Sequence, residues 1–213
     1  MRQTGWRRRM KRGLDVSVAA TALVATAPVM LGTACAIRAT MGSPVLFRQE
    51  RPGRGEQIIK IMKFRSMRDP LPHEVASQSD AQRITRLGAF LRKSSIDELP
   101  QLVNILRGDM SLVGPRPLVK QYLDRYTLEQ RRRHDVMPGL TGWAQVNGRN
   151  GLSWEEKFAH DVWYVDHWSL RLDAKILAKT VVQVLKRDGI SSDGHATMPE
   201  FMGSGSAQAE PTT

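Results

Sequence analysis

The sequence is poor in the residues that build disulfide frameworks and zinc sites. Cys35 is the single cysteine among 213 residues, so an intramolecular disulfide is excluded and no oxidising compartment is needed. It lies in an apolar segment, where a free thiol behaves as a small hydrophobic side chain. The five histidines show no ligand spacing with cysteine, which argues against a zinc site. The chemistry of this chain therefore depends on other side chains.

Acidic residues are scarce in the first third of the chain. Residues 1–68 contain 14 Lys and Arg against 3 Asp and Glu, whereas residues 69–213 contain 18 of each, so the net charge of +11 arises in the first third. A nucleic-acid-binding protein usually carries a basic stripe through its folded domain. We therefore expect no nucleic-acid partner. Basic residues around an apolar segment point instead to anionic lipid headgroups.

Residues 16–37 form an apolar run without a charged side chain. As a helix it would be about 33 Å long, near the thickness of a bilayer core. A signal peptide fits the basic start, but the run continues past the small residues that would be cleaved. A single membrane span fits the length, but both flanks are basic, which gives little asymmetry to orient it. We favour a re-entrant helix that breaks at Pro28 and returns to the same face, with Thr26 satisfying a freed carbonyl.

The most informative stretch is residues 92–117, RKSSIDELPQLVNILRGDMSLVGPRP. The adjacent carboxylates Asp97 and Glu98 precede an apolar pattern of helical period, and Ser95 and Glu98 have the spacing of a capping box. Acids in a first turn can serve the helix dipole alone. Cations flank this pair, however: Arg92 precedes it and Arg116 lies between two prolines. A helix start beside fixed cations binds anions, and carboxylates in such a site indicate metal-assisted phosphate chemistry.

The remaining pattern predicts an α+β chain that is mostly helical. A β-hairpin is expected over residues 44–68, with strands over 45–49 and 58–66. Lys63 and Arg65 would lie on one face of the second strand, either solvated or completing a phosphate site. Helices are expected over residues 80–93, 118–134, 153–165 and 169–187, and the glycine-dense loop 137–149 allows backbone N–H groups to approach a ligand. We divide the chain into a basic flank and membrane helix (1–40), a cytoplasmic-face catalytic domain (41–189) and a mostly disordered tail (190–213).

Several long motifs occur in order and carry a family resemblance: KRGLDV, GSPVLFRQERPG, KIMKFRSM, the 92–117 stretch and MPGLTGWAQVNGRN. Together they resemble the bacterial sugar transferases, and more narrowly the small monotopic phosphoglycosyl transferases that start glycan assembly on polyprenyl phosphate. The resemblance covers residues 11–189. It implies a re-entrant membrane helix with amphipathic helices at the membrane surface, on the cytoplasmic face of the bacterial inner membrane. The family commonly breaks its membrane helix at Ser-Pro, whereas this chain has Ala27 before Pro28.

The resemblance also implies a reaction and its residues. Asp97 would attack the sugar-bearing phosphate of a UDP-sugar, release UMP and hold the phosphosugar until polyprenyl phosphate takes it. Glu98 would coordinate Mg²⁺. The residues expected near the phosphates are Lys63, Arg92 and Arg116, and those expected to position substrate or support the site are Arg149 and Asp161.

The tail residues 193–197 and Phe201 resemble relatives that act on N-acetylated deoxy-amino sugars. Downstream glycosyltransferases are further expected partners. The competing hypothesis is a membrane-docked scaffold that binds anionic lipid without chemistry.

Overall fold

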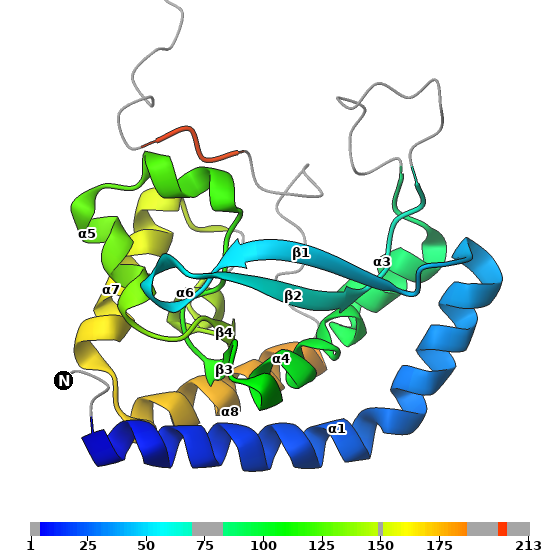
Figure 1. The fold of residues 1–213 in the computed structure, drawn as a ribbon, viewed down its shortest axis with the longest axis horizontal. Coiled ribbons are helices and arrows are strands. Elements are labelled where there is room, and N and C mark those ends of the chain that lie inside the picture. The colour runs from blue at the N-terminus through cyan, green and yellow to red at the C-terminus, as the bar shows by residue number, and fades with distance from the viewer. Residues whose placement is uncertain (1–4, 70–82, 149–150, 187–199, 204–213) are drawn as a thin grey trace, which may run out of the picture.

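The computed structural model describes residues 5–69, 83–148, 151–186 and 200–203, and its longest element is the first helix (Figure 1). Helix α1 (Gly5–Met41) runs for 37 residues and contains Pro28. It is the one helix in the described residues that is long and apolar enough to cross a membrane by length and composition. Figure 1 shows α1 running beneath the rest of the chain and then turning upward toward β1.

The expected break at Pro28 does not interrupt the helix, since α1 continues through Pro28 as one element; Figure 1 shows that this helix bends along its length. Proline lacks an N–H, so the carbonyl of Val24 loses its partner four residues on. Thr26 does not supply a substitute, because its hydroxyl donates to the carbonyl of Ala22 at 2.7 Å. The predicted role of Thr26 is therefore wrong.

The predicted hairpin is present, with a longer first strand than expected. Strands β1 (Leu46–Pro52) and β2 (Ile58–Phe64) pair antiparallel from Leu46↔Phe64 to Pro52↔Ile58. The short 3-10 helix η1 (Arg54–Glu56) makes the turn. Arg65, just after β2, is buried and donates to the carbonyls of Met41 and Ser43 at 3.2 Å, so it fixes the end of α1.

Helix α3 (Arg86–Lys93) begins later than the sequence predicts, because Thr85 is its N-cap and accepts from the N–H of Gly88 at 2.9 Å. The expected residues 80–82 lie outside the described residues. Gly88 lies directly against the backbone after β2: a Cβ there would be 1.8 Å from the carbonyl oxygen of Ser66. This close approach brings α3 beside β2 and points its C-terminal end toward the acid pair.

The middle of the chain departs most from the prediction. Helix α4 (Gln101–Arg107) ends at Gly108, as expected. The single helix predicted over 118–134 is wrong, because it divides into η3 (Lys120–Arg125), α5 (Leu128–Arg131) and η4 (Arg132–Asp135). Thr127 and Gln130 form a capping box that starts a new helix there.

The glycine-dense loop contains strand β4 (Gly139–Thr141) and helix α6 (Trp143–Val146), and β4 pairs parallel with β3 (Ser111–Val113). A Cβ on Gly139 would lie 2.1 Å from the backbone nitrogen of Gly114. The glycines at 114 and 139 thus allow two backbones to pack together, rather than leaving N–H groups open to a ligand.

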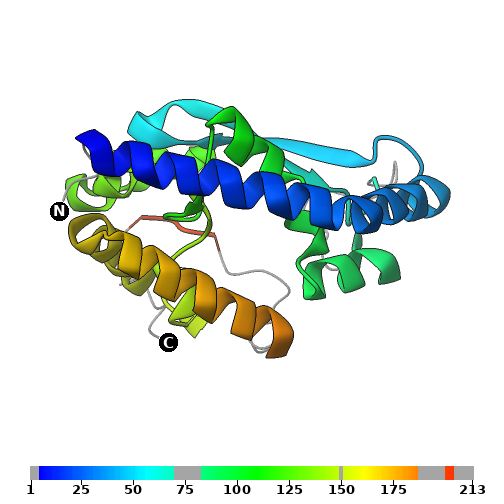
Figure 2. The ribbon, with the colours of Figure 1, turned by 90° about the horizontal axis from the view of Figure 1, so that it is seen from below.

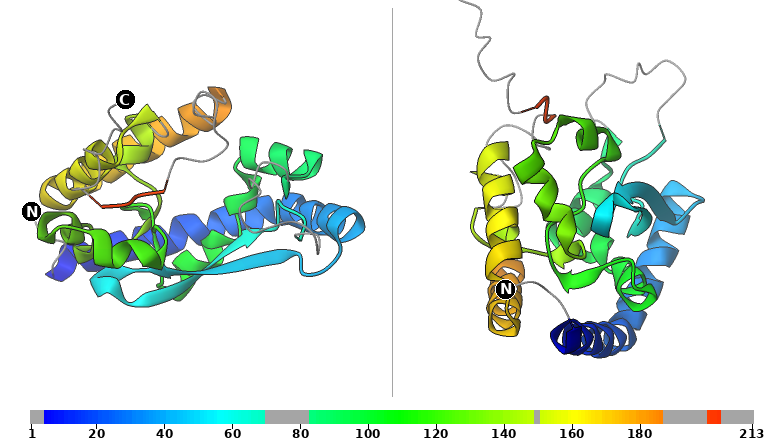
Figure 3. Two further views of the ribbon diagram at one scale, coloured as in Figure 1. Left: turned by 90° about the horizontal axis from the view of Figure 1, so that it is seen from above. Right: turned by 60° about the vertical axis from the view of Figure 1, so that its left-hand side comes forward.

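Two C-terminal helices match the prediction. Helix α7 (Trp154–His167) starts at the predicted capping box of Ser153 and Glu156, and α8 (Leu170–Lys186) follows it. Figure 2 shows α1 and α8 converging at their N-terminal ends. Figure 3 shows the hairpin on one side of α1 and the pair α7 and α8 on the other. The main apolar cluster joins these parts, with Ala19, Ile61, Ile105 and Ile176 buried in it.

Candidate active site

Asp97 and Glu98 lie on the 3-10 helix η2 (Ile96–Glu98), between α3 and α4. The capping box predicted for Ser95 and Glu98 is wrong, since the Ser95 side chain caps nothing. Ser95 instead adopts the left-handed conformation with φ 57°, which is uncommon for a residue other than glycine and tends to mark functional sites. This residue reverses the chain after α3 and presents both carboxylates at the start of the helical run that continues into α4.

Glu98 is the centre of a charged cluster made from three separate parts of the chain. Lys63 on β2 donates from Nζ to Glu98 Oε1 at 2.7 Å. Arg116, from the Pro115–Pro117 segment, donates from Nη1 to Oε2 at 3.3 Å and from Nη2 to Oε1. Burial alone would raise the pKa of Glu98, but the charges and hydrogen bonds of Arg116 and Lys63 hold that pKa well below its usual range. Glu98 is therefore ionised whenever both cations are present.

Asp97 has a different environment although it is the adjacent residue. Its exposed fraction is 8%, and its carboxylate accepts no hydrogen bond within the part of the chain that the structure describes. Burial, followed by the charge of Glu98, raises the pKa of Asp97 to about 6, against the opposing effect of the nearby cations. At neutral pH this side chain is an ionised, poorly solvated carboxylate. Such a group is suited to nucleophilic attack.

The other predicted phosphate ligands lie around this pair. Arg92, at the end of α3, donates from Nε to Ser66 Oγ at 2.9 Å, and its charge lowers the pKa of Asp97. The Arg116 side chain is 41% exposed despite its contact with Glu98, so its outer face is open to an anion. Lys63, Arg92 and Arg116 bring three positive charges to two carboxylates. The net charge of the site is thus positive, which suits a negatively charged phosphate ester.

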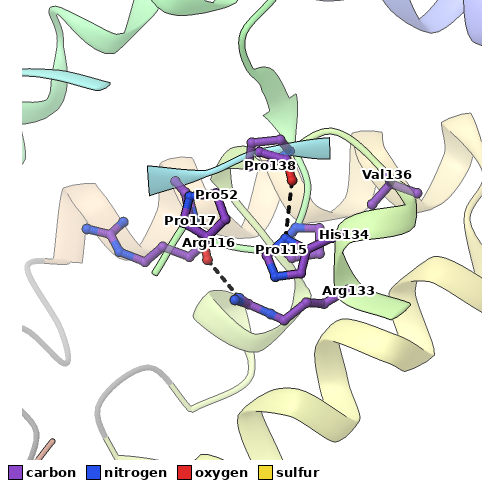
Figure 4. Close-up of a pocket in the computed structure, with 9 residues that line it drawn as sticks. Pro52, Pro115, Arg116, Pro117, Arg133, His134, Val136 and Pro138 are labelled. Atoms are coloured by element: carbon purple, nitrogen blue, oxygen red, sulfur yellow. Dashed lines mark hydrogen bonds between the residues drawn. The ribbon is translucent and has the colours of Figure 1, made fainter. Parts of the chain in front are cut away.

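Arg116 is supported from behind by buried polar contacts. Arg133 donates from Nη2 to the backbone carbonyl of Arg116 at 2.7 Å, as Figure 4 shows beside a pocket too small for more than a water molecule. Arg133 in turn pairs with Asp161 at 2.7 Å, with side chains 2% and 5% exposed. Asp161 is therefore placed as a support for the Arg116 backbone. Arg149 lies outside the described residues.

His134 completes the wall of this pocket (Figure 4). Its Nδ1 lies 3.2 Å from the carbonyl oxygen of Gly53 at the end of the hairpin. Burial, with the charge of Arg133, lowers the pKa of His134 to about 4. The ring is therefore neutral at physiological pH and serves as a rigid contact between the hairpin and the segment of Arg116.

A magnesium ion at the carboxylate pair would need substrate phosphates and waters to complete its set of ligands. Within the described residues no group of three or more His, Cys, Asp or Glu side chains could hold a metal ion by itself. Mg²⁺ is commonly held by one or two carboxylates while phosphates and waters complete its shell. Asp97 has free oxygens for this purpose, whereas both oxygens of Glu98 already accept from cations. Metal binding by Glu98 would therefore compete with Lys63 and Arg116.

Sequence reasoning missed two residues that shape the site. Asn104 is fully buried on α4, where it accepts from the N–H of Met62 at 3.0 Å and donates to the carbonyl of Lys60 at 2.8 Å. These bonds join α4 to β2 and so bring Lys63 to Glu98. The available signal was a polar residue within the apolar pattern of residues 102–106.

Arg51 on β1 is the second residue that was missed. Burial and the like charge of Arg116 lower the pKa of Arg51 to about 10, and its guanidinium donates to Gln49 Oε1 at 2.6 Å. This half-buried cation near Arg116 adds to the positive charge of the site. Its only sequence signal was its position in the QERPG motif.

Comparison with known proteins gives the family of this chain. The profile of the bacterial sugar transferases matches residues 6–187. The chain belongs to the bacterial sugar transferase family. It is 50% identical over 196 residues to the uncharacterized sugar transferase EpsL of Bacillus subtilis, covering 92% of this chain and 97% of the relative.

Two further family members have names that state a reaction. One is the UDP-glucose:undecaprenyl-phosphate glucose-1-phosphate transferase of Caulobacter vibrioides, 44% identical over 188 residues, which cover 84% of this chain and 70% of the relative. Another is the UDP-N-acetylgalactosamine-undecaprenyl-phosphate N-acetylgalactosaminephosphotransferase of Aeromonas hydrophila, 40% identical over 184 residues, which cover 83% and 44%. The chain thus corresponds to less than half of this second relative.

Proposed function

We propose that this protein transfers a sugar-1-phosphate from a UDP-sugar to polyprenyl phosphate, with release of UMP. The observation that carries the proposal is that the two adjacent acids have different environments. Glu98 accepts from Lys63 and Arg116, whereas Asp97 is buried without a hydrogen bond in the described structure. Related proteins from Caulobacter and Aeromonas are named for this reaction with glucose and N-acetylgalactosamine. That agreement between site chemistry and family supports the proposal.

The residues carry out two displacements at one phosphorus atom. An Asp97 oxygen attacks the phosphate that bears the sugar, the bond to the UMP oxygen breaks, and the sugar phosphate remains on Asp97 as an acyl phosphate. An oxygen of polyprenyl phosphate then attacks the same phosphorus and releases the Asp97 carboxylate, giving the polyprenyl diphosphate sugar. Lys63, Arg92 and Arg116 stabilise the negative charge on the phosphate oxygens. Glu98 would hold Mg²⁺ in exchange for part of its contact with Lys63 and Arg116, and the ion would supply charge neutralisation for the diphosphate.

The proposed donor is an N-acetylated amino or deoxy-amino sugar. Residues 193–197, which contribute to this resemblance, lie outside the described residues. Phe201 is buried in a cluster with Tyr122, Tyr126 and Phe158, close behind the Arg133–Asp161 pair. Phe201 thus shares a cluster with Phe158, which lies under Arg133, and Arg133 holds the carbonyl of Arg116; this chain of contacts supports a tail that influences the choice of sugar.

The proposed membrane placement is monotopic, on the cytoplasmic face of the bacterial inner membrane. Both ends of α1 contact the same domain: Lys11 pairs with Asp173 on α8 at 2.6 Å, while Ile37 packs against Phe64 and Leu91. A helix that crossed the bilayer would carry its ends to opposite sides. The bend of α1 and its exposed Val24 and Leu31 therefore support a helix that enters the membrane and returns. Anionic lipids and downstream glycosyltransferases are the further partners of this proposal.

The test uses purified protein in detergent with Mg²⁺, polyprenyl phosphate and a panel of UDP-sugars, with release of UMP as the readout. We expect release with one class of sugar, loss of release on adding EDTA, and no release by Asp97→Asn. Asp124→Asn is the matched control, because Asp124 is an exposed carboxylate with no interaction among the described residues. UMP release by folded Asp97→Asn would refute the nucleophile, and a protein inactive with every donor would favour the scaffold hypothesis.

A further inference from the structure

The KRGLDV motif at the start of α1 has no role in the chemistry proposed above, yet its charged side chains turn toward the domain. Arg12 donates from Nη1 to the carbonyl of Ile105 at 2.5 Å and from Nη2 to the carbonyl of Leu106 at 2.9 Å. Lys11 is 5% exposed and pairs with Asp173. Asp15 accepts from the N–H of Leu112 at 3.2 Å. One turn of α1 thus contacts α4, β3 and α8.

Arg12 contacts the opposite end of the segment that carries the acid pair. Helical hydrogen bonds continue from η2 into α4, since Leu99 donates to Ile96, Leu102 to Leu99 and Val103 to Pro100 at 3.0–3.2 Å. The carbonyls of a helix's last turn have no partners within the helix. Arg12 donates to two of them in α4, the carbonyl of Leu106 and that of Ile105, which also accepts from the N–H of Gly108 at 3.1 Å. The guanidinium of Arg12 lies beside the glycine that ends α4, since a Cβ on Gly108 would be in ordinary contact with Arg12 Nη2 at 3.5 Å.

Polar contacts from outside reach α4 at two positions in the described structure. Asn104 fixes the helix to the backbone of β2, and Arg12 fixes the end of the helix to α1. Glu98 lies about 9 Å from Asn104 along the helix, and Leu106 about 3 Å in the other direction, at about 1.5 Å per residue. Lys63 and Arg116 hold the Glu98 side chain, but they do not hold the backbone of this segment. If its backbone pivoted at Asn104, a small shift at Leu106 would become a shift about three times larger at residue 98 and would move both carboxylates. The apolar packing of the buried Leu102 and Ile105 also holds the helix, but it is not directional and sets no hydrogen-bond register.

We propose that Arg12 is a positioning residue for the Asp97–Glu98 site, because its guanidinium holds the far end of α4 and thereby fixes the two carboxylates. This inference rests on the proposed function for its catalytic consequence. It assigns a second role to the membrane helix: α1 anchors the protein and also aligns the nucleophile. Lys11 and Asp15 hold the same turn of α1 in place through Asp173 and Leu112.

The test compares Arg12→Ala and Arg12→Lys with Arg9→Ala in full-length protein. Arg9 is the matched control, because it lies one turn earlier, lines the same open surface as Arg12 and makes no hydrogen bond among the described residues. We expect kcat for UMP release to fall about 10- to 100-fold in Arg12→Ala, since a misplacement of about 1 Å has that effect. KM for the UDP-sugar should change less than threefold, because Lys63 and Arg116 come from other elements. Arg12→Lys keeps the charge but lacks the rigid planar fork that aims two donors at neighbouring carbonyls, so its kcat should also fall.

Two further measurements separate positioning from a general loss of structure. Methylguanidinium should restore part of the kcat of Arg12→Ala, since the surface around residue 12 is open to solvent. Hydrogen–deuterium exchange should show faster uptake over residues 96–107 in Arg12→Ala than in Arg9→Ala. Equal uptake in the two variants, or equal kcat, would overturn the inference. An inactive wild-type protein would instead refute the proposed function, and the exchange experiment would still report whether Arg12 holds α4.

Discussion

Neutralising Asp97 should stabilise the protein while it abolishes turnover. The folded state raises the pKa of Asp97 from its ordinary value of 3.8 to about 6, with burial as the largest cause. This difference corresponds to about 3 kcal/mol of unfavourable free energy for keeping the carboxylate ionised in the folded protein. Asp97→Asn removes that cost, and at 8% exposure the site offers little solvent to screen it. We therefore expect the melting temperature at pH 8 to rise by about 6 to 12 °C.

The sign of the effect fixes its dependence on pH. Because the folded protein binds the Asp97 proton more tightly than the unfolded chain does, this group favours folding below pH 4 and loses that contribution as pH rises through about 6. The asparagine variant has no such titration. The difference in stability between Asp97→Asn and wild type should therefore be about a fifth of its full value at pH 4 and reach that full value above pH 7.

The assay is thermal unfolding in detergent, followed by tryptophan fluorescence from pH 4 to pH 8. Glu98→Gln is the opposing variant: Arg116 and Lys63 hold the pKa of Glu98 below its usual range, so its neutralisation should lower stability at pH 8. A gain in Asp97→Asn that is the same at every pH would refute the reasoning. So would a loss of stability in that variant at pH 8, since it would show that Asp97 is favourably paired.

Three further predictions follow from the same structure. The rate of UMP release at low donor concentration should fall tenfold per pH unit below about pH 6, where Asp97 becomes protonated; a flat profile between pH 5 and pH 7 would contradict this assignment. Asp161→Asn leaves Arg133 buried without its counter-charge and should lower the free energy of unfolding by about 3 to 5 kcal/mol, measured by thermal unfolding. The double variant Asp161→Leu/Arg133→Met should recover part of that loss. Gly88→Ala should lower the melting temperature and the rate of UMP release together, because its Cβ would collide with the carbonyl of Ser66 beside Arg92.

The sequence predicted those elements that local chemistry determines. The capping box at Ser153 starts α7, and Gly108 ends α4, because both depend on residues within one turn. Residues 118–134 show the limit of this reasoning. Their apolar residues have helical spacing, but Thr127 and Gln130 start a separate helix and Tyr122 and Tyr126 pack into an aromatic cluster. Tertiary packing thus replaced one long helix by three short ones.

The sequence predicted the residues of the candidate site but not the contacts between them. The sequence singled out the acid pair together with Lys63, Arg92 and Arg116. It could not show that Glu98 accepts from Lys63, 35 positions away, and from Arg116, 18 positions away. That pairing separates the behaviour of two adjacent carboxylates, because it lowers the pKa of Glu98 while burial raises that of Asp97. The distinct roles of the two acids are therefore a property of the fold.

The charged residues at the start of α1 show how a correct local pattern can hide a second function. Counted along the sequence, Lys11 and Arg12 belong to a basic flank that faces lipid headgroups. In the structure Lys11 reaches Asp173, 162 positions away, and Arg12 reaches the end of α4. The domain boundary predicted at residue 40 separates the basic and apolar first segment from the rest of the chain, but hydrogen bonds join α1 to residues beyond that boundary. Without α1, Asp173 would lose the hydrogen bond from Lys11, the N–H of Leu112 its acceptor and the carbonyl of Leu106 the donor Arg12, so α1 is structurally part of the domain.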